Sequence, residues 1–363
     1  MAMPAPSDPA PTTRRTLDAL VARGATPGFQ HVFAAADGWR FSHHGGLADP
    51  RAQRPVTAAT SFNTYSVTKT LTAAAVLQLV DQGLVDLDQP LARHVGQPPL
   101  HSTATVRQAL LHTAGFANPN PLAWVHLDRE RMAFDSRRFV GDLLQARGQP
   151  TAAPGAGYAY SNIGYLWLGL LVEQVSGLPY SRFVADRLIT PLRLGAGETL
   201  AFDLPDPAAH ACGTLRRFGW LNAVFGWLVD RDRLVDSTAG PWVQMRHHQV
   251  NGEAYGGLIG NAAGLVRYGL ALLNRDDLLS PASRALLFSA QPAPGPARSL
   301  GWVMGSLDRE PWCAHAGGGA GYYAELRIYP RLGCASAVLF NRAGIRDERF
   351  LDRLDRALVA ARR

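Results

Sequence analysis

The most uniformly apolar stretch of the chain runs from residue 66 to residue 82. Its apolar side chains are Val67, Leu71, Ala73, Ala74, Ala75, Val76, Leu77, Leu79 and Val80. A helix that is hydrophobic on every side is expected to be buried in the centre of a fold rather than on its surface. Gly83 follows, and glycine commonly ends a helix. The pattern therefore predicts a buried central helix.

Alternating runs toward both ends of the chain predict β-strands. Residues 29–49 contain two strand-like runs joined at Asp37-Gly38, a dipeptide typical of hairpin turns. Three further runs of this kind lie in the C-terminal third, at 299–307, 322–330 and 333–341. We expect all of them to form antiparallel strands.

Helical patterns flank these strands. A first helix is expected over residues 14–24, closed by Gly24, and residues 255–274 are expected to end in a helix. A final helix is predicted over residues 347–363, whose last turn is rich in arginine, in keeping with the helix dipole.

The middle of the chain has a different pattern of hydrophobic and polar residues. Residues 86–254 mix short helical runs, such as 104–115 and 137–148, with long loops rich in proline and glycine, and contain few convincing strands. We therefore predict an α+β fold, in which an antiparallel sheet built from both chain ends is flanked by helices. Its parts would be a disordered leader over 1–13, a sheet domain over 14–85 and 255–363, and a mostly helical inserted domain over 86–254.

Composition argues against several classes of protein. The net charge is +7, but the arginines are scattered without a dense basic run, which argues against nucleic-acid binding. Three cysteines without CxxC spacing argue against a disulfide framework and against a cysteine-based zinc site. No segment approaches the roughly 18 apolar residues of a membrane span, and the N-terminus has no signal-type apolar core. We expect a cytoplasmic enzyme that acts on a small molecule without a cofactor or a metal.

Among 36 basic residues the chain has one lysine, Lys69, three positions after Ser66 at the start of the apolar helix. Positions i and i+3 share a helix face, so the hydroxyl and the amine can meet. A serine is a weak nucleophile until a base takes its proton. A buried lysine can be that base, whereas an arginine does not lose its proton in proteins. In the alternative interpretation, Ser66 caps the helix and Lys69 reaches solvent.

A second candidate group, Tyr160-Ser161-Asn162, stands at the start of a helix expected to run to Gly177. A tyrosine beside a lysine ammonium has its phenolate form favoured and can accept a proton. The Asn162 amide can hold both the lysine and a substrate amide or ester. Alternatively, Asn162 caps the helix and the tyrosines serve packing.

Four glycines, at 317, 318, 319 and 321, precede the strand predicted over 322–330. They permit close approach of a ligand to the backbone. A backbone N–H at this place, paired with that of Ser66, could hold a developing oxyanion. The alternative is a flexible loop between strands. A phosphate-binding loop is not expected, because no Gly-Lys-Ser/Thr follows and the glycines precede a strand rather than a helix.

Taken in this order, Ser-x-x-Lys, Tyr-x-Asn and His-x-Gly resemble the motifs of the serine beta-lactamase and penicillin-binding protein superfamily. The variants are similar to the class C beta-lactamase-related branch, which includes family VIII carboxylesterases. Further matching sequence segments are LLHTAGF at 110–116, TPLRL at 190–194 and the strand end at 339–342. The resemblance covers roughly residues 29–345 and implies a beta-lactamase-like fold.

The resemblance implies that Ser66 is the acylated nucleophile, that Lys69 activates it and that Tyr160 is the general base. Asn162 would orient Lys69 and the substrate.

In the third motif, the resemblance implies that His315 takes the first position, that Gly317 closes the motif and that Gly318 supplies the second oxyanion N–H. Relatives that bind the carboxylate of penicillins or D-Ala-D-Ala commonly have a lysine where this chain has His315. A neutral imidazole would hold that carboxylate less well, which disfavours such substrates. The chain also has Gly264 where relatives often have aspartate, a position we interpret as structural.

Residues 216–248 are rich in aromatic side chains: Trp220, Phe225, Trp227 and Trp242. They are expected either to line an acyl pocket or form a lid, or to serve core or subunit packing. The adjacent His247 and His248 have no carboxylate spacing beside them, so no metal site is expected there.

The leading hypothesis is therefore a serine hydrolase that cleaves ester or amide bonds through an acyl-Ser66 intermediate, with carboxylesterase as the favoured activity. An acyltransferase using the same site is the close alternative. A beta-lactamase or D-Ala-D-Ala peptidase comes next, and a non-catalytic binding module on the same scaffold remains as a different class.

Overall fold

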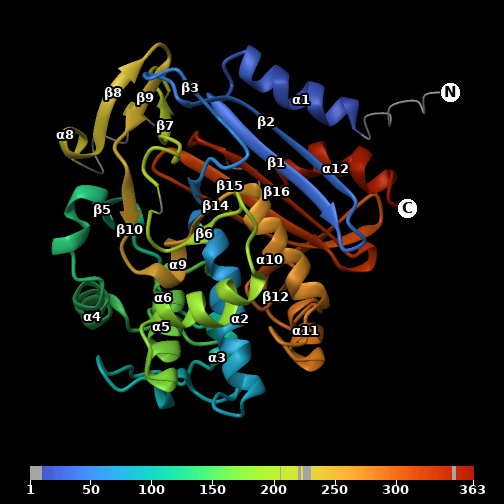
Figure 1. Cartoon of the computed structure of the whole chain (residues 1–363). Coiled ribbons are helices and arrows are strands. Elements are labelled where there is room, and N and C mark those ends of the chain that lie inside the picture. The colour runs from blue at the N-terminus through green and yellow to red at the C-terminus, as the bar shows by residue number, and fades with distance from the viewer. Residues whose placement is uncertain (1–9, 205, 220–221, 224–229, 346–348) are drawn as a thin grey trace.

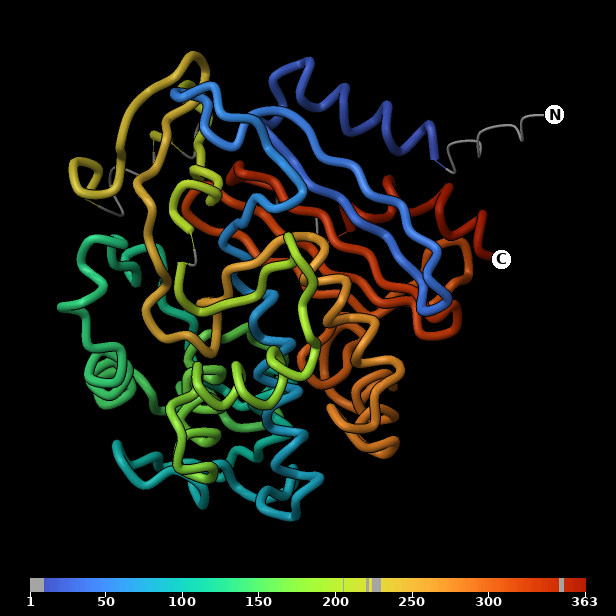
Figure 2. Tube along the Cα trace, viewed as in Figure 1, coloured from blue at the N-terminus to red at the C-terminus, as the bar shows by residue number. Residues whose placement is uncertain are grey.

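A single antiparallel sheet joins the two ends of the chain. The computed structural model describes residues 10–204, 206–219, 222–223, 230–345 and 349–363. The sheet has eight strands in the order β12-β13-β14-β15-β16-β1-β2-β3. In chain order the strands are β1 (Gly28–Ala35), β2 (Arg40–Asp49), β3 (Arg54–Pro55), β12 (Arg298–Ser299), β13 (Trp302–Leu307), β14 (Glu310–Gly319), β15 (Tyr322–Tyr329) and β16 (Cys334–Phe340). The N-terminal hairpin pairs with β16, so blue and red strands lie side by side in Figures 1 and 2.

Every residue of β1 is buried because helices cover both faces of the sheet. Alternate side chains of a strand point to opposite faces. Phe29 packs with Leu17 and Leu354 toward α1 (Pro11–Ala22) and α12 (Phe350–Ala360). Val32 and Ala34 face the main core instead. The α+β class predicted from the alternating runs is confirmed.

Helix α2 (Thr68–Asp81) follows a 3-10 turn over Tyr65–Val67 and runs through the main core, with Thr68 to Leu79 all buried. The predicted central helix is thus confirmed. Its partners are α5 (Asn162–Ser176) and α9 (Glu253–Gly256), while α10 (Ala262–Asn274) packs against β1, β15 and β16 of the sheet.

Both terminal helices differ slightly from their predicted ranges. Helix α1 begins at Pro11, a favourable first-turn residue, rather than at residue 14. Most of the expected leader, residues 1–9, lies outside the described residues. Helix α12 begins at Phe350, and residues 347 and 348 of its predicted range also lie outside them.

The middle of the chain is helical as predicted but contains more strands than the sequence suggested. Its helices are α3 (Val106–Leu110), α4 (Ser136–Arg147), α5, α6 (Tyr180–Val184), α8 (Arg231–Leu234) and α9. Its strands are β5 (Val125–Leu127), β6 (Leu200–Ala201), β7 (Thr214–Arg216), β8 (Val235–Ala239), β9 (Trp242–Met245) and β10 (His248–Val250). Helix α11 (Pro281–Leu287) and the short strands β4 (Phe62–Asn63) and β11 (Ile259–Gly260) complete the described elements. The division into two domains at residues 85 and 254 stays a prediction.

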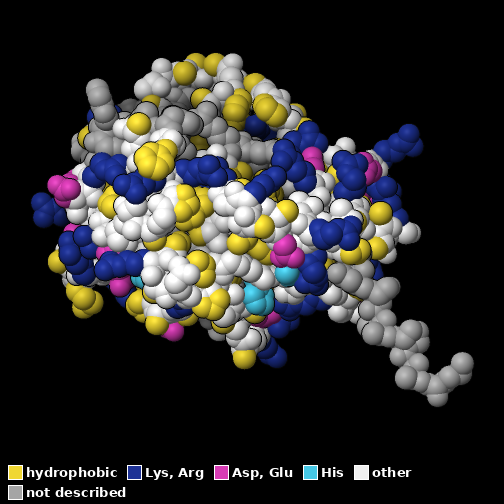
Figure 3. Space-filling model, turned by 90° about the horizontal axis from the view of Figure 1, so that it is seen from above, with side chains coloured by type: hydrophobic (Ala, Val, Ile, Leu, Met, Phe, Trp, Pro, Cys, Tyr) yellow, Lys and Arg dark blue, Asp and Glu magenta, His cyan; other side chains and the backbone are white. Residues whose placement is uncertain are grey.

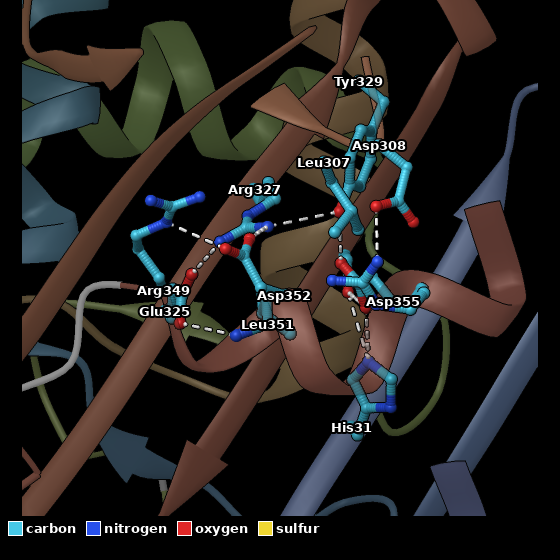
Figure 4. A network of polar contacts seen from close by, with 12 residues as sticks. His31, Leu307, Asp308, Glu325, Arg327, Tyr329, Arg349, Leu351, Asp352 and Asp355 are labelled. Carbon is cyan, nitrogen blue, oxygen red and sulfur yellow. Dashed lines mark hydrogen bonds and ion pairs between the residues drawn. The ribbon is translucent and has the colours of Figure 1, made fainter. Parts of the chain in front are cut away.

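A buried polar network joins α12 to the outer face of the sheet (Figure 4). The Arg327 guanidinium donates to Glu325 at 2.9 Å and also pairs with Asp352. His31 Nε2 lies 3.2 Å from Asp355 Oδ1. All of these side chains except Asp352 are fully buried, so α12 is attached by charges as well as by apolar contacts.

Surface arginines are spread among apolar side chains on the face shown in Figure 3. Among the described residues, no helix is both long and apolar enough to cross a membrane.

Candidate active site

Ser66 lies in the 3-10 turn that leads into α2, with its hydroxyl directed at two partners. Its Oγ lies 3.1 Å from Lys69 Nζ and accepts a hydrogen bond of 2.8 Å from Tyr160 Oη. The first helical turn has Val67 at its N-cap position. The alternative interpretation of Ser66 as a helix cap is therefore wrong, and its hydroxyl contacts Lys69 and Tyr160 instead.

Lys69 is fully buried, which excludes the alternative in which it reaches solvent. Its Nζ donates to Asn162 Oδ1 and to the Tyr255 carbonyl, both at 2.8 Å. Burial away from water holds the lysine pKa well below its ordinary value. In the neutral amine these two N–H bonds leave the lone pair free for the Ser66 proton.

Aromatic rings surround the amine. The centroids of three phenol rings lie 4.9, 5.3 and 5.4 Å from Nζ, those of Tyr160, Tyr165 and Tyr255. They exclude water from the amine on the sides not taken by carbonyl groups.

The start of α5 supplies the second motif. Ser161 caps this helix, with its Oγ accepting from the Gly164 N–H at 3.1 Å. Asn162 is the first helical residue, so its side chain is available to Lys69. The alternative interpretation of Asn162 as the cap is wrong.

His112 holds the loop that carries Tyr160. The two ring centroids lie 4.4 Å apart with the ring planes tilted by 35°, and His112 Nδ1 accepts from the Ser161 N–H at 3.1 Å. The His112 carbonyl accepts from Ala159, and its φ of 59° is unusual for a residue other than glycine. Burial holds the His112 pKa well below its ordinary value. His112 was not singled out from the sequence beyond its place in the 110–116 segment.

Gly317, Gly318 and Gly319 lie inside β14, and Gly321 is in the turn that leads to β15. The alternative of a flexible loop between strands is therefore wrong for the first three. A Cβ on Gly317 would come within 2.0 Å of Thr64 O and 2.7 Å of Ser66 N. Only glycine allows this strand to approach the Ser66 N–H so closely. Gly318 is exposed beside it and pairs with Tyr323 on the neighbouring strand.

His315 is also in β14 and is buried. Its Nδ1–H donates to the Ala316 carbonyl at 2.9 Å, which leaves Nε2 as an acceptor. Burial, with a smaller contribution from the charge of Arg298, lowers the His315 pKa to about 3. The ring is therefore neutral at physiological pH, as the sequence argument assumed.

A narrow pocket of about 20 Å³ adjoins Tyr160. Its polar and aromatic lining comes from His112, Tyr158, Tyr160, Arg298, Trp302 and His315. Arg298 and the Tyr255 carbonyl were not found from the sequence, because a backbone acceptor has no sequence signal and Arg298 lies outside every motif.

The aromatic segment is only partly described. Trp220, Phe225 and Trp227 lie outside the described residues, so their role as lid or pocket stays a prediction. Trp242 is buried in β9, where the Arg216 guanidinium lies 5.8 Å from its ring.

The two adjacent histidines have different partners. His247 Nε2 lies 3.5 Å from Cys212 Sγ, whereas His248 Nε2 hydrogen-bonds Tyr65 Oη at 2.8 Å. His248 thereby supports Tyr65, the residue that precedes Ser66. No group of three or more metal-ligating side chains occurs in the part of the chain that the structure describes.

Gly264 lies in the first turn of α10, where a Cβ would come within 2.4 Å of Thr199 O. The close packing accounts for a glycine here and agrees with the structural interpretation.

Known proteins share this architecture. The sequence model of the Beta-lactamase family matches residues 13–361. Penicillin-binding protein 4 of Amycolatopsis lactamdurans is 29% identical over 317 residues, 82% of this chain and 76% of that protein. The crystal structure of SurE matches with 28% identity and a TM-score of 0.70, covering 97% of this chain and 75% of the other. D-amino acid amidase from Ochrobactrum anthropi SV3 is similar in fold, with a TM-score of 0.74 at 21% identity over 98% of this chain and all of the other.

Proposed function

Because the chain belongs to the Beta-lactamase family of serine hydrolases, we propose that it cleaves an ester or amide bond of a small molecule through an acyl-Ser66 intermediate, and that it is a carboxylesterase. The observation that carries the proposal is the meeting of one hydroxyl with a buried amine at 3.1 Å and a phenol at 2.8 Å.

In the proposed reaction, Ser66 Oγ attacks the substrate carbonyl and its proton passes to Lys69 or Tyr160. The N–H groups of Ser66 and Gly318 would hold the negative oxygen of the tetrahedral intermediate. As the intermediate collapses, Tyr160 would return a proton to the leaving alcohol or amine. Water then hydrolyses the acyl-enzyme by the reverse sequence of proton transfers.

Incubation with phenyl acetate or a fluorophosphonate, followed by peptide mass spectrometry, tests this proposal. We expect a covalent adduct on Ser66 in the wild type and none in Ser66→Ala. An unmodified wild-type Ser66 with both reagents would instead favour a non-catalytic binding module.

Hydrolysis and acyl transfer share the same intermediate. Supplying the acyl donor together with candidate alcohols and amines distinguishes them. We expect release of the free acid to outrun transfer, because a carboxylesterase uses water as its acceptor.

A further inference from the structure

A cavity of about 630 Å³ lies among the helices of the middle part of the chain. It is lined by α4, α5, α6 and the start of α9, and α5 contacts each of the other three helices (Figure 1). Along α5 the lining extends from Leu166 to Gly177, away from the end of the helix that carries Asn162. The cavity is therefore separate from the site around Ser66, and its volume is typical of pockets that hold small organic molecules.

Apolar side chains form one part of the cavity wall. They come from α4, from α5 and from the loop between α5 and α6: Val140, Leu166, Leu170, Leu178 and Pro179. Contact with this wall removes the apolar surface of a ligand from water, which favours binding of a hydrocarbon group.

Two carboxylates line the same cavity, those of Glu173 on α5 and Glu253 on α9. Glu253 accepts a hydrogen bond from Ser136 Oγ, and Glu173 accepts one from the Tyr180 N–H, both at 2.9 Å. Both donors are neutral, and among the described residues neither carboxylate has a cation within ion-pair distance. Burial raises the pKa of Glu253, and the charge of Glu173 contributes in the same direction. A cation in the cavity would favour the ionised form of both groups.

Arg137 is the cationic side chain of the described lining, and it does not neutralise these carboxylates. It is exposed on α4 and pairs with neither of them. An anionic ligand would have to lie beside two negative charges to reach it, and water screens an exposed guanidinium. The charges of the cavity therefore favour a cationic ligand.

We propose that this cavity is a second ligand site, which binds a small primary amine with its ammonium on Glu253 and Glu173 and its hydrocarbon group along α4 and α5. An ammonium has three N–H donors, and charge-assisted hydrogen bonds to carboxylates are stronger than neutral ones. The site is independent of the proposed hydrolysis at Ser66.

Calorimetry with three ligands of similar size tests the charge preference: 2-phenylethylamine, 2-phenylethanol and 3-phenylpropanoate. The protein is Ser66→Ala, which has no nucleophile and is otherwise the full chain. We expect the amine to bind with a Kd below about 1 mM, and the alcohol and the anion to bind about tenfold more weakly or not at all. Equal binding of the amine and the alcohol, a preference for the anion, or no binding of the amine would overturn the proposal.

Two further substitutions in this background locate the amine. Glu253→Gln keeps an acceptor for Ser136 but removes the charge, so amine binding should weaken about tenfold or more. Gly141→Leu should also weaken it, by filling the cavity from α4, because a Cβ on Gly141 has no neighbouring atom within 4 Å. The matched control is Asp142→Asn, which removes a 77% exposed carboxylate from α4 outside the described lining and should leave the affinity unchanged.

Circular dichroism checks that each variant is folded. Unchanged amine affinity in folded Glu253→Gln or in folded Gly141→Leu would overturn the proposal, as would an equal loss in Asp142→Asn. The measurement needs no turnover, so its failure would leave the proposed function untouched, and failure of Ser66 to react with phenyl acetate would leave the amine site untouched.

Discussion

Two buried basic side chains, Lys69 in the cleft and Arg327 under α12, have opposite surroundings. Arg327 lies between the carboxylates of Glu325 and Asp352 (Figure 4). Lys69 is held by the amide oxygen of Asn162 and a backbone carbonyl, and no carboxylate is among its described partners. Neutral acceptors satisfy the N–H groups of an amine without stabilising its charge, whereas carboxylates do both.

The two buried basic side chains therefore serve different purposes in the same fold. The network beneath α12 keeps its cation charged and uses it to attach a helix. The candidate active site instead contains Lys69, which is able to lose its proton because only neutral dipoles and aromatic rings surround it. The choice of lysine in one place and arginine in the other follows, because arginine cannot become neutral.

Lys69→Arg should have the largest effect, because it retains a basic group that cannot accept the Ser66 proton. We expect kcat/KM for phenyl acetate to fall about 10³-fold or more, while circular dichroism shows an intact fold. Activity close to that of the wild type would refute the role of Lys69 as base.

Arg327→Met should act on stability instead. It leaves Glu325 without its cation and Asp352 with Arg349 alone, which lowers the free energy of unfolding by about 3–5 kcal/mol. Urea denaturation measures the loss, and Arg138→Met, which breaks an exposed pair with Asp142, should change it by less than about 1 kcal/mol. Equal changes in the two variants would show that the network does not attach α12.

Asn162→Asp would give Lys69 the kind of partner that Arg327 has. A carboxylate beside Nζ favours the ammonium, so the Lys69 pKa should rise and less neutral amine should be present at neutral pH. We expect kcat/KM to fall about tenfold to hundredfold, with the acid limb of its pH profile moved to higher pH. An acid limb in its wild-type position would contradict this account of the cleft.

His112→Asn should have the smallest effect. Asparagine tolerates the positive φ and can accept from the Ser161 N–H, so this variant removes chiefly the ring that packs against Tyr160. We expect kcat to fall about threefold to tenfold with little change in KM. An unchanged kcat would mean that the contact between the His112 and Tyr160 rings does not position Tyr160.

The sequence predicted the fold class and the buried helix because hydrophobic periodicity records which faces are covered. It missed strands β7 to β10 because they are short and interrupted by turns. It placed the glycines of the third motif before a strand, although pairing with β15 makes them part of β14. Strand pairing between distant segments is a tertiary effect that such a local pattern does not contain.

The candidate site followed the same rule. Four site residues were recognisable from the sequence because their reactive side chains occur in short motifs: Ser66, Lys69, Tyr160 and Asn162. The Tyr255 carbonyl, the His112 ring and the Arg298 guanidinium were not, because their roles come from the three-dimensional contacts of residues far apart in the chain.

A titration of Lys69 tests directly whether its amine is neutral at the pH at which the enzyme works. The titration is possible because Lys69 is the only lysine in the sequence. Protein labelled with ¹³C at lysine Cε should give one lysine NMR signal, whose chemical shift followed against pH reports the pKa of the amine. We expect a midpoint well below 10.5, with kcat/KM falling as the pH drops through that same midpoint. A midpoint at the ordinary lysine value would contradict it, since the amine would then be charged when the enzyme works.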